Sequence, residues 1–113
     1  MNNKLDNAFK MAEAITKKVI ANKNGGYVYV IINWSFKDWV KVGVAKDLSR
    51  RLSTYQTSSP YRDYRYHFTL AVDDTRTIEK DFKDHLIGKE RKDHEWYLMT
   101  PNRAKEIILE IVS

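Results

Sequence analysis

Two short runs rich in valine, isoleucine, tyrosine and tryptophan, residues 27–33 and 39–45, constrain the fold of this chain more than any other feature. β-branched and aromatic residues favour extended strands, and two such runs joined by a short connection predict an antiparallel hairpin. Because side chains alternate along a strand, the valines of the second run share one face and Lys41 lies on the other. With the valine face in the core, we expect Lys41 on the opposite, functional side of the sheet.

Helix and strand signals continue on both sides of the hairpin. Apolar residues at three- and four-residue steps predict helices, and alternation of apolar and polar residues predicts strands. Asp47 and Thr100 are good N-caps, because their side-chain oxygens can accept hydrogen bonds from free backbone N–H groups. Besides the hairpin, the expected elements are helices at 4–22, 48–56, 76–87 and from 101, and strands at 64–72 and 95–99. This order predicts an α+β domain in which a small mixed sheet packs against helices.

The helix predicted over residues 4–22 is amphipathic, and the glycines that follow Asn24 end it. We therefore divide the chain into an N-terminal helix at 1–24 and a single domain at 25–113. The simplest role for the helix is to cover a sheet edge, and dimerisation or partner binding is the alternative.

The composition excludes several classes of protein. The 113 residues include no cysteine, which rules out disulfides and thiolate metal sites, and the three histidines lack the close spacing of a structural zinc site. No apolar run approaches the length of a membrane span and no signal peptide is evident, so we expect a cytoplasmic protein. The net charge of +5 favours an anionic partner, nucleic acid first.

Most of the positive charge is concentrated near the hairpin. Residues 37–67 contain seven basic and three acidic residues, which leaves +4 of the chain's +5. We expect DNA backbone contacts from this segment, with the strong salt dependence that counterion release produces. The candidate DNA-binding residues are Lys46, Arg50, Arg62 and Arg65. Tyrosines are interleaved with them and either stack on unpaired bases or pack inward. These tyrosines are Tyr55, Tyr61, Tyr64 and Tyr66.

Four side chains suit phosphodiester hydrolysis, although each taken singly is also an ordinary packing or surface residue. The reaction needs a base for the attacking water, a cation at the scissile phosphate and usually a metal ion held by a carboxylate. Tyr29 can act as the base if neighbouring cations lower the pKa of its phenol. Lys41 can supply that charge, or accept the phenolic proton if desolvated, while the guanidinium of Arg51 suits phosphate oxygens. Glu79, in the third predicted helix, is a candidate ligand for Mg²⁺, which keeps most of its waters.

The arrangement of these residues resembles the GIY-YIG nuclease superfamily. The segments that carry the resemblance are Gly26-Tyr27-Val28-Tyr29, Val40-Lys41-Val42-Gly43, Ala45-Lys46-Asp47-Leu48, Arg51 with Tyr55, the helical stretch from Ile78-Glu79 to His85, and Glu95-Trp96-Tyr97. They extend from residue 26 to about 99, most of the chain. Within the superfamily the chain is most similar to a compact phage and bacterial branch with lysine in the second motif.

The resemblance implies a small central three-stranded antiparallel sheet flanked by helices, and cleavage of DNA that depends on Mg²⁺ or Mn²⁺. The catalytic set that it implies is Tyr29, Lys41, Arg51, Tyr55 and His85, with Glu79 as the metal ligand. Lys41 stands where tyrosine is usual and assists Tyr29. His85 orients the phosphate or relays a proton, with a buried structural histidine as the alternative.

Three hypotheses for function follow. The first is a divalent-metal-dependent endonuclease that hydrolyses DNA. The second is a DNA-binding module that keeps the fold but has lost cleavage. The third is a phage-type interaction protein that binds a host factor through the N-terminal helix.

Overall fold

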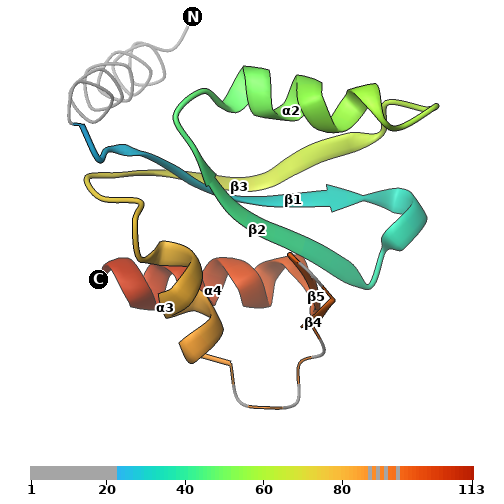
Figure 1. Cartoon of the computed structure of the whole chain (residues 1–113). Coiled ribbons are helices and arrows are strands. Elements are labelled where there is room, and N and C mark those ends of the chain that lie inside the picture. Colours follow the sequence, from blue (N-terminus) through green and yellow to red (C-terminus); the bar gives the residue numbers. More distant parts are fainter. Residues whose placement is uncertain (1–22, 87, 89, 91, 94) are drawn as a thin grey trace, which may run out of the picture.

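The hairpin predicted from the sequence is the centre of the fold (Figure 1). The computed structural model describes residues 23–86, 88, 90, 92–93 and 95–113. The helix predicted at 4–22, and with it nearly all of the unit predicted at 1–24, lies outside the described residues. The elements in chain order are β1 Gly26–Asn33, the 3-10 helix η1 Trp34–Phe36, β2 Trp39–Ala45, α2 Leu48–Thr57, β3 Tyr64–Val72, α3 Ile78–Asp84, β4 Lys92–Asp93, β5 Trp96–Leu98 and α4 Pro101–Val112.

The sheet has five antiparallel strands in the order β3-β1-β2-β5-β4. The α+β class is retained, but the expected three-stranded sheet is wrong. Of the two strands beyond the expected three, β5 has three residues and lies within the strand predicted at 95–99, whereas β4 has two residues and was not predicted. A two-residue strand carries no alternation pattern, and β5 joins the sheet only by pairing with Trp39, Val40 and Lys41 of β2. Pairing over so few residues leaves little signal in the sequence.

Alternation along the central strands gives the sheet two buried faces. On one face the valines of β1 and β2 pack against α3 and α4, and on the other Tyr29 and Ile31 pack beneath α2 (Figure 1). The prediction that the valine face of β2 is core is confirmed, and Lys41 lies on the opposite face. The buried residues of the larger core are Val28, Val30, Val40, Val42, Val72, Ile78, Phe82, Tyr97, Met99, Ala104, Ile107 and Ile108.

The helix caps explain where the helices begin. Asp47 accepts a hydrogen bond from the backbone N–H of Arg50, so α2 begins at Leu48 as predicted. The N-cap predicted at Thr100 is confirmed by the same kind of bond at the start of α4. Helix α3 is shorter than the predicted helix at 76–87. It begins later because Asp74 accepts a hydrogen bond from Arg76 N–H in a turn, and it ends at its C-cap, His85.

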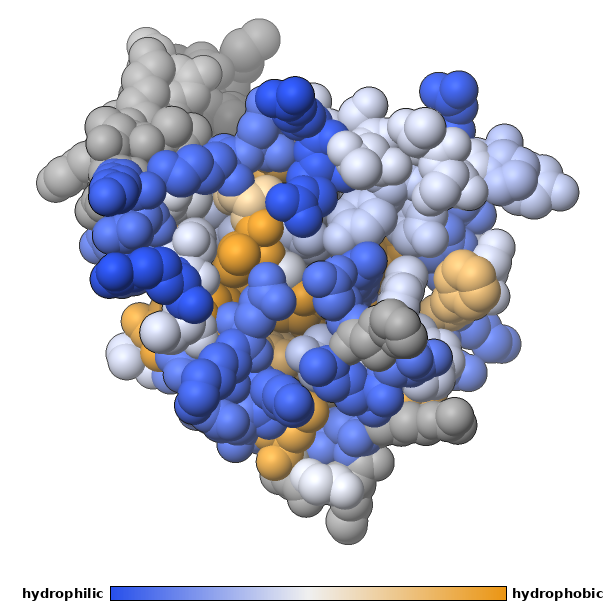
Figure 2. Space-filling model, viewed as in Figure 1, coloured by the Kyte–Doolittle hydropathy of each residue, from blue (hydrophilic) through white to orange (hydrophobic). Residues whose placement is uncertain are grey.

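None of the helices in the described part of the chain has the length and apolar character needed to cross a bilayer. The face of the molecule shown in Figure 2 is largely hydrophilic, and apolar side chains show through near its middle.

Candidate functional site

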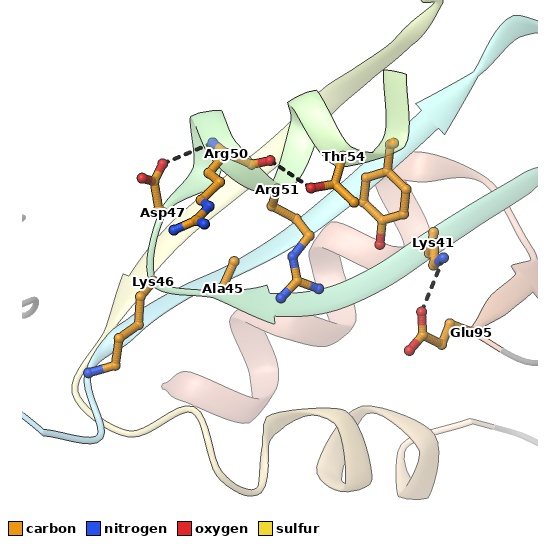
Figure 3. A pocket seen from close by; sticks show the side chains of 9 residues that line it. Lys41, Ala45, Lys46, Asp47, Arg50, Arg51, Thr54 and Glu95 are labelled. Atoms are coloured by element: carbon orange, nitrogen blue, oxygen red, sulfur yellow. Dashed lines mark hydrogen bonds and ion pairs between the residues drawn. The ribbon is translucent and has the colours of Figure 1, made fainter. Parts of the chain in front are cut away.

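A pocket of about 520 Å³ lies on the α2 side of the sheet, where β2 leads into α2 (Figure 3). We call it the phosphate pocket for the cations that line it. Its lining residues are Lys41, Ala45, Lys46, Asp47, Arg50, Arg51, Thr54, Tyr55 and Glu95. The first turn of α2 forms part of the wall, and a helix N-terminus favours anions. Four basic and two acidic side chains leave the lining positive.

Tyr55, which lines this pocket, forms a hydroxyl pair with the buried Tyr29. Their hydroxyl oxygens are 2.8 Å apart, and either can be the donor. Tyr29 is only 1% exposed, whereas Tyr55 is half-buried and lines the pocket. Tyr55 therefore presents the hydroxyl that a bound molecule can reach, and Tyr29 holds it from beneath.

The environment of Tyr29 keeps its phenol protonated. Burial raises the pKa of Tyr29 well above its usual range, and the hydrogen bond and charge of Tyr55 raise it further. The positive charge of Arg51 lowers the pKa, but by less than burial raises it. The condition set for Tyr29 as a base, a pKa lowered by neighbouring cations, is therefore not met by the side chains of the site alone.

Lys41 is held as a cation between a carboxylate and two rings. Its Nζ lies 3.1 Å from Glu95 Oε2, 4.5 Å from the ring centroid of Tyr55 and 5.8 Å from that of Trp96. Partial burial alone would lower the pKa of Lys41, but its interactions with Glu95 and Tyr55 leave the pKa above its ordinary value. Of the two roles predicted for Lys41, the geometry favours the supplier of charge over the proton acceptor.

Three further cations extend along the pocket from α2 and the segment before it. Arg51 reaches from α2 towards β2 (Figure 3), where contacts with Tyr29 and Tyr55 outweigh partial burial and raise its pKa. Lys46 Nζ donates to the backbone carbonyl of Lys23, and Arg50 lies one residue before Arg51 on the helix. These side chains form a row of donors suited to a phosphate backbone.

Glu79 approaches from α3, on the other side of the sheet. Burial, and next the negative charge of Glu95, raise the pKa of Glu79, while the charges of Arg51 and Lys92 lower it. Glu79 is therefore within electrostatic reach of the phosphate pocket. Among the described residues, Val42–Ala45 of β2 have ladder partners only in β1, so this stretch of the β2 edge lies open towards α3.

Three predicted site residues lie away from the phosphate pocket. His85 is exposed at the end of α3, and its Nδ1 is 2.8 Å from the carbonyl of Asp81. Arg65 stacks its guanidinium over Trp34 at 4.4 Å, on β3. Arg62 occupies the turn between α2 and β3 with a φ of 49°. The predicted DNA-binding set thus divides between the pocket, with Lys46 and Arg50, and a surface beyond the far end of α2.

Two residues of the site were missed from the sequence. Glu95 forms its ion pair with Lys41 because β5 lies beside β2, and no local sequence pattern predicts that these two strands pair. Gly43 leaves room for the ring of Tyr29: a Cβ at this position would lie 2.5 Å from Tyr29 Oη and 2.7 Å from its Cζ. An isolated glycine inside a strand pattern was the available signal, because it often marks a close approach.

The fold and the site together define an α+β domain with a cationic pocket of the kind that binds phosphate groups. The chain belongs to the T5orf172 domain family, whose sequence profile matches residues 26–112. This is a nucleic-acid-related family of phage type. No curated protein and no solved structure matches the chain.

The assignment to the GIY-YIG superfamily is wrong, because the profile that matches the chain is that of T5orf172. The resemblance depended on short segments, chiefly a Gly-Tyr pair and a Lys-Val-Gly run in a hairpin. Strand composition alone often produces such segments, so they have a high rate of chance matches. The site must therefore be judged on its own geometry.

Proposed function

We propose that this chain is an endonuclease that hydrolyses DNA phosphodiester bonds with the help of a divalent metal ion. The observation that carries the proposal is the convergence of Lys41, Arg50 and Arg51 on a pocket that is also lined by Tyr55, whose hydroxyl is bonded to that of the buried Tyr29. A nucleic-acid-related family and a positively charged chain agree with DNA as the substrate.

Arg51 and Lys41 have separate parts in this proposal. The planar fork of Arg51 binds two oxygens of the scissile phosphate and stabilises the charge that develops there. The ammonium of Lys41 lies beside the Tyr55 ring and adds positive charge at the same place. A phosphate that enters competes with Glu95 for Lys41, because that carboxylate is its present partner.

Tyr55 is the member of the hydroxyl pair that touches substrate. Its hydroxyl accepts a hydrogen bond from the attacking water and so orients the water towards phosphorus, while the proton of that water passes to bulk solvent and the leaving oxygen takes up a proton from solvent. Tyr29, with its raised pKa, is a positioning residue: as a neutral phenol it fixes the Tyr55 hydroxyl through their 2.8 Å contact. This assignment reverses the relative importance predicted for the two tyrosines.

The carboxylates suit a hard divalent cation. Partial burial, and next the negative charge of Glu95, raise the pKa of Glu79, and a bound cation would favour the charged carboxylate against both. Within the described residues no group of three His, Asp or Glu side chains is assembled for a metal, so Glu79 and waters would be the ligands, as Mg²⁺ and Mn²⁺ accept. When bound, the ion would supply positive charge at the phosphate and a more acidic water.

The test is cleavage of labelled single- and double-stranded DNA by the purified full chain, with Mg²⁺, with Mn²⁺ and with EDTA. Glu79→Gln and Arg51→Ala are expected to lower the cleavage rate by about a hundredfold or more. Glu110→Gln and Lys83→Ala, exposed on α4 and α3, are the matched controls and should cleave normally. Cleavage in EDTA, or undiminished cleavage by both site variants, would refute the proposed site.

A DNA-binding module without cleavage is the second candidate. Two observations favour it: the pKa of Tyr29 is raised rather than lowered, and Glu95 already neutralises Lys41. Binding of DNA that depends on Arg51, together with no cleavage in either metal, would establish this candidate in place of the enzyme.

A further inference from the structure

A second hollow, lined mainly by aromatic rings, lies next to the phosphate pocket. We call it the aromatic groove, and its volume is about 410 Å³. Its lining residues are Phe36, Trp39, Tyr64, Asp93 and Trp96. They come from η1, β2, β3, β4 and β5, so four of the five strands contribute. The chain has three tryptophans, and two of them line this groove while Trp34 lies in η1 beside it.

The rings of the groove form a connected series that leads to the phosphate pocket. The Phe36 and Trp96 centroids are 5.8 Å apart, those of Tyr64 and Trp96 are 6.3 Å apart, and those of Tyr55 and Tyr64 are 5.5 Å apart. Tyr55 lines the phosphate pocket, so the series ends beside the proposed reaction centre. A molecule that spans both hollows passes directly from cations to rings.

Lys41 marks the boundary between the two hollows. Its Nζ is close to the Tyr55 ring on one side and within 5.8 Å of the Trp96 centroid on the other. A phosphate bound at Lys41 therefore has an aromatic surface next to it. This juxtaposition of a phosphate-binding cation and a ring is the one that a nucleotide requires, because its base is attached through the sugar to its phosphate.

The two aromatic side chains of η1 are too exposed to be explained by packing alone, while Trp39, Tyr64 and Trp96 are half-buried. Trp34 is 66% exposed and Phe36 is 50% exposed. Arg65 lies over Trp34 at 4.4 Å, so a cation accompanies this exposed ring. Exposed rings grouped with cations are typical of surfaces that bind single-stranded nucleic acid, where the rings stack on bases and the cations follow the backbone.

We propose that the aromatic groove holds an unpaired nucleobase of the same nucleic acid whose phosphate enters the phosphate pocket. This inference rests on the proposed function for the identity of the phosphate pocket and adds the substrate class. A base inside a duplex is paired and has both faces stacked, so it cannot enter a groove walled by rings. The substrate is therefore single-stranded DNA, or duplex DNA with unpaired nucleotides beside the bound phosphate.

Tryptophan fluorescence gives a direct test, because stacking of a base on Trp39 or Trp96 quenches emission. The full chain is titrated in EDTA with a single-stranded oligonucleotide and, separately, with the blunt duplex of the same sequence. We expect quenching and tighter binding with the single strand and little quenching with the duplex. Working without metal separates binding from cleavage.

Phe36 is the residue to vary, because its exposed ring can be removed with little effect on the core. Phe36→Ala and Phe36→Leu are expected to weaken single-strand binding by about tenfold or more and to leave duplex binding unchanged. Phe36→Trp should retain single-strand binding. Leu109→Ala, at an exposed apolar position on α4, is the matched control, and circular dichroism verifies that each variant is folded.

The outcomes separate this inference from the proposed function. Equal affinity for single strand and duplex, or no effect of Phe36→Ala, overturns the groove even if the protein cleaves DNA. Quenching that depends on Phe36, without cleavage in any metal, supports the groove and overturns the enzyme. If neither DNA binds and the chain instead forms a dimer in light scattering that Phe36→Ala dissociates, the groove is an interface between copies and the inference fails.

Discussion

Replacement of Gly43 by alanine is the most incisive test of how the hydroxyl pair is positioned. The added Cβ would lie 2.5 Å from Tyr29 Oη and 2.7 Å from Cζ, closer than carbon atoms approach in folded proteins. The Tyr29 ring cannot move away freely, because it is 1% exposed and its centroid lies 5.5 Å from that of Tyr66. The clash therefore either bends β2 or displaces the ring and separates it from Tyr55.

The magnitude follows from three contributions. Overpacking of a filled site costs about 1–3 kcal/mol. Loss of the Tyr29–Tyr55 hydrogen bond adds about 1 kcal/mol, and the lower backbone entropy of alanine in a strand returns about 0.5–1 kcal/mol. We expect Gly43→Ala to lower the free energy of unfolding by about 2 kcal/mol. Urea unfolding followed by circular dichroism measures this directly, with the m-value as a check that the unfolded state is unchanged.

A double-mutant cycle makes the reasoning refutable. Tyr29→Leu removes the ring, so Gly43→Ala in that background is expected to be neutral or slightly stabilising, with a coupling of about 2 kcal/mol between the two positions. If Gly43→Ala is equally costly with and without the Tyr29 ring, the glycine is needed for some other reason. If it is harmless in the unmodified chain, the close approach itself is wrong.

Three other predictions concern the site and its surroundings. Tyr55→Phe should reduce the rate of cleavage by about a hundredfold and Tyr29→Phe by clearly less, since only Tyr55 reaches the substrate. Single-turnover rates in the reverse order would restore Tyr29 as the reacting group. Glu95→Gln should tighten DNA binding a few-fold in EDTA, most at low salt, because Lys41 loses the carboxylate that competes with phosphate. Fluorescence anisotropy measures the affinity, and weaker binding by the variant would contradict the prediction. Hydrogen bonds from Ser59, and then from Asn33 and Ser35, hold the pKa of Asp63 below its ordinary value. The ionised carboxylate therefore stabilises the fold at pH values above its unfolded-state pKa. That stabilisation is lost as the pH falls through the folded-state pKa. Asp63→Asn should therefore flatten the acid side of the stability curve measured by denaturation at a series of pH values, and an unchanged acid slope would count against those hydrogen bonds.

The parts of the fold that local sequence determines were predictable. Alternation in residues 39–45 placed Lys41 on the face opposite the valines, because side-chain direction in a strand depends only on position. Asp47 and Thr100 located the starts of α2 and α4, because a cap acts within its own helix turn. These inferences needed no knowledge of what lies nearby in space.

The parts that depend on distant contacts were not predictable. The ion pair of Lys41 with Glu95 exists because β5 pairs with β2, and a three-residue strand gives no sign of its partner. The pKa of Tyr29 is raised chiefly because the side chain is buried beneath α2, so the phenol that was expected to act as a base stays protonated. Likewise, no local pattern separates Arg65, which stacks on Trp34, from the cations of the pocket.

The strand order β3-β1-β2-β5-β4 has a consequence for synthesis of the protein. The phosphate pocket draws Lys41 from β2, Arg51 and Tyr55 from α2, and Glu95 from the turn before β5, while α4 supplies core residues from the end of the chain. Consider a ribosome-bound chain from which only the hairpin and α2 have emerged. It has the cations of the pocket, but it lacks Glu95, which pairs with Lys41, and it lacks α4, which completes the core. Until Glu95 has emerged, such a nascent chain presents Lys41 without its carboxylate partner, so the pocket carries more positive charge than it does in the folded domain.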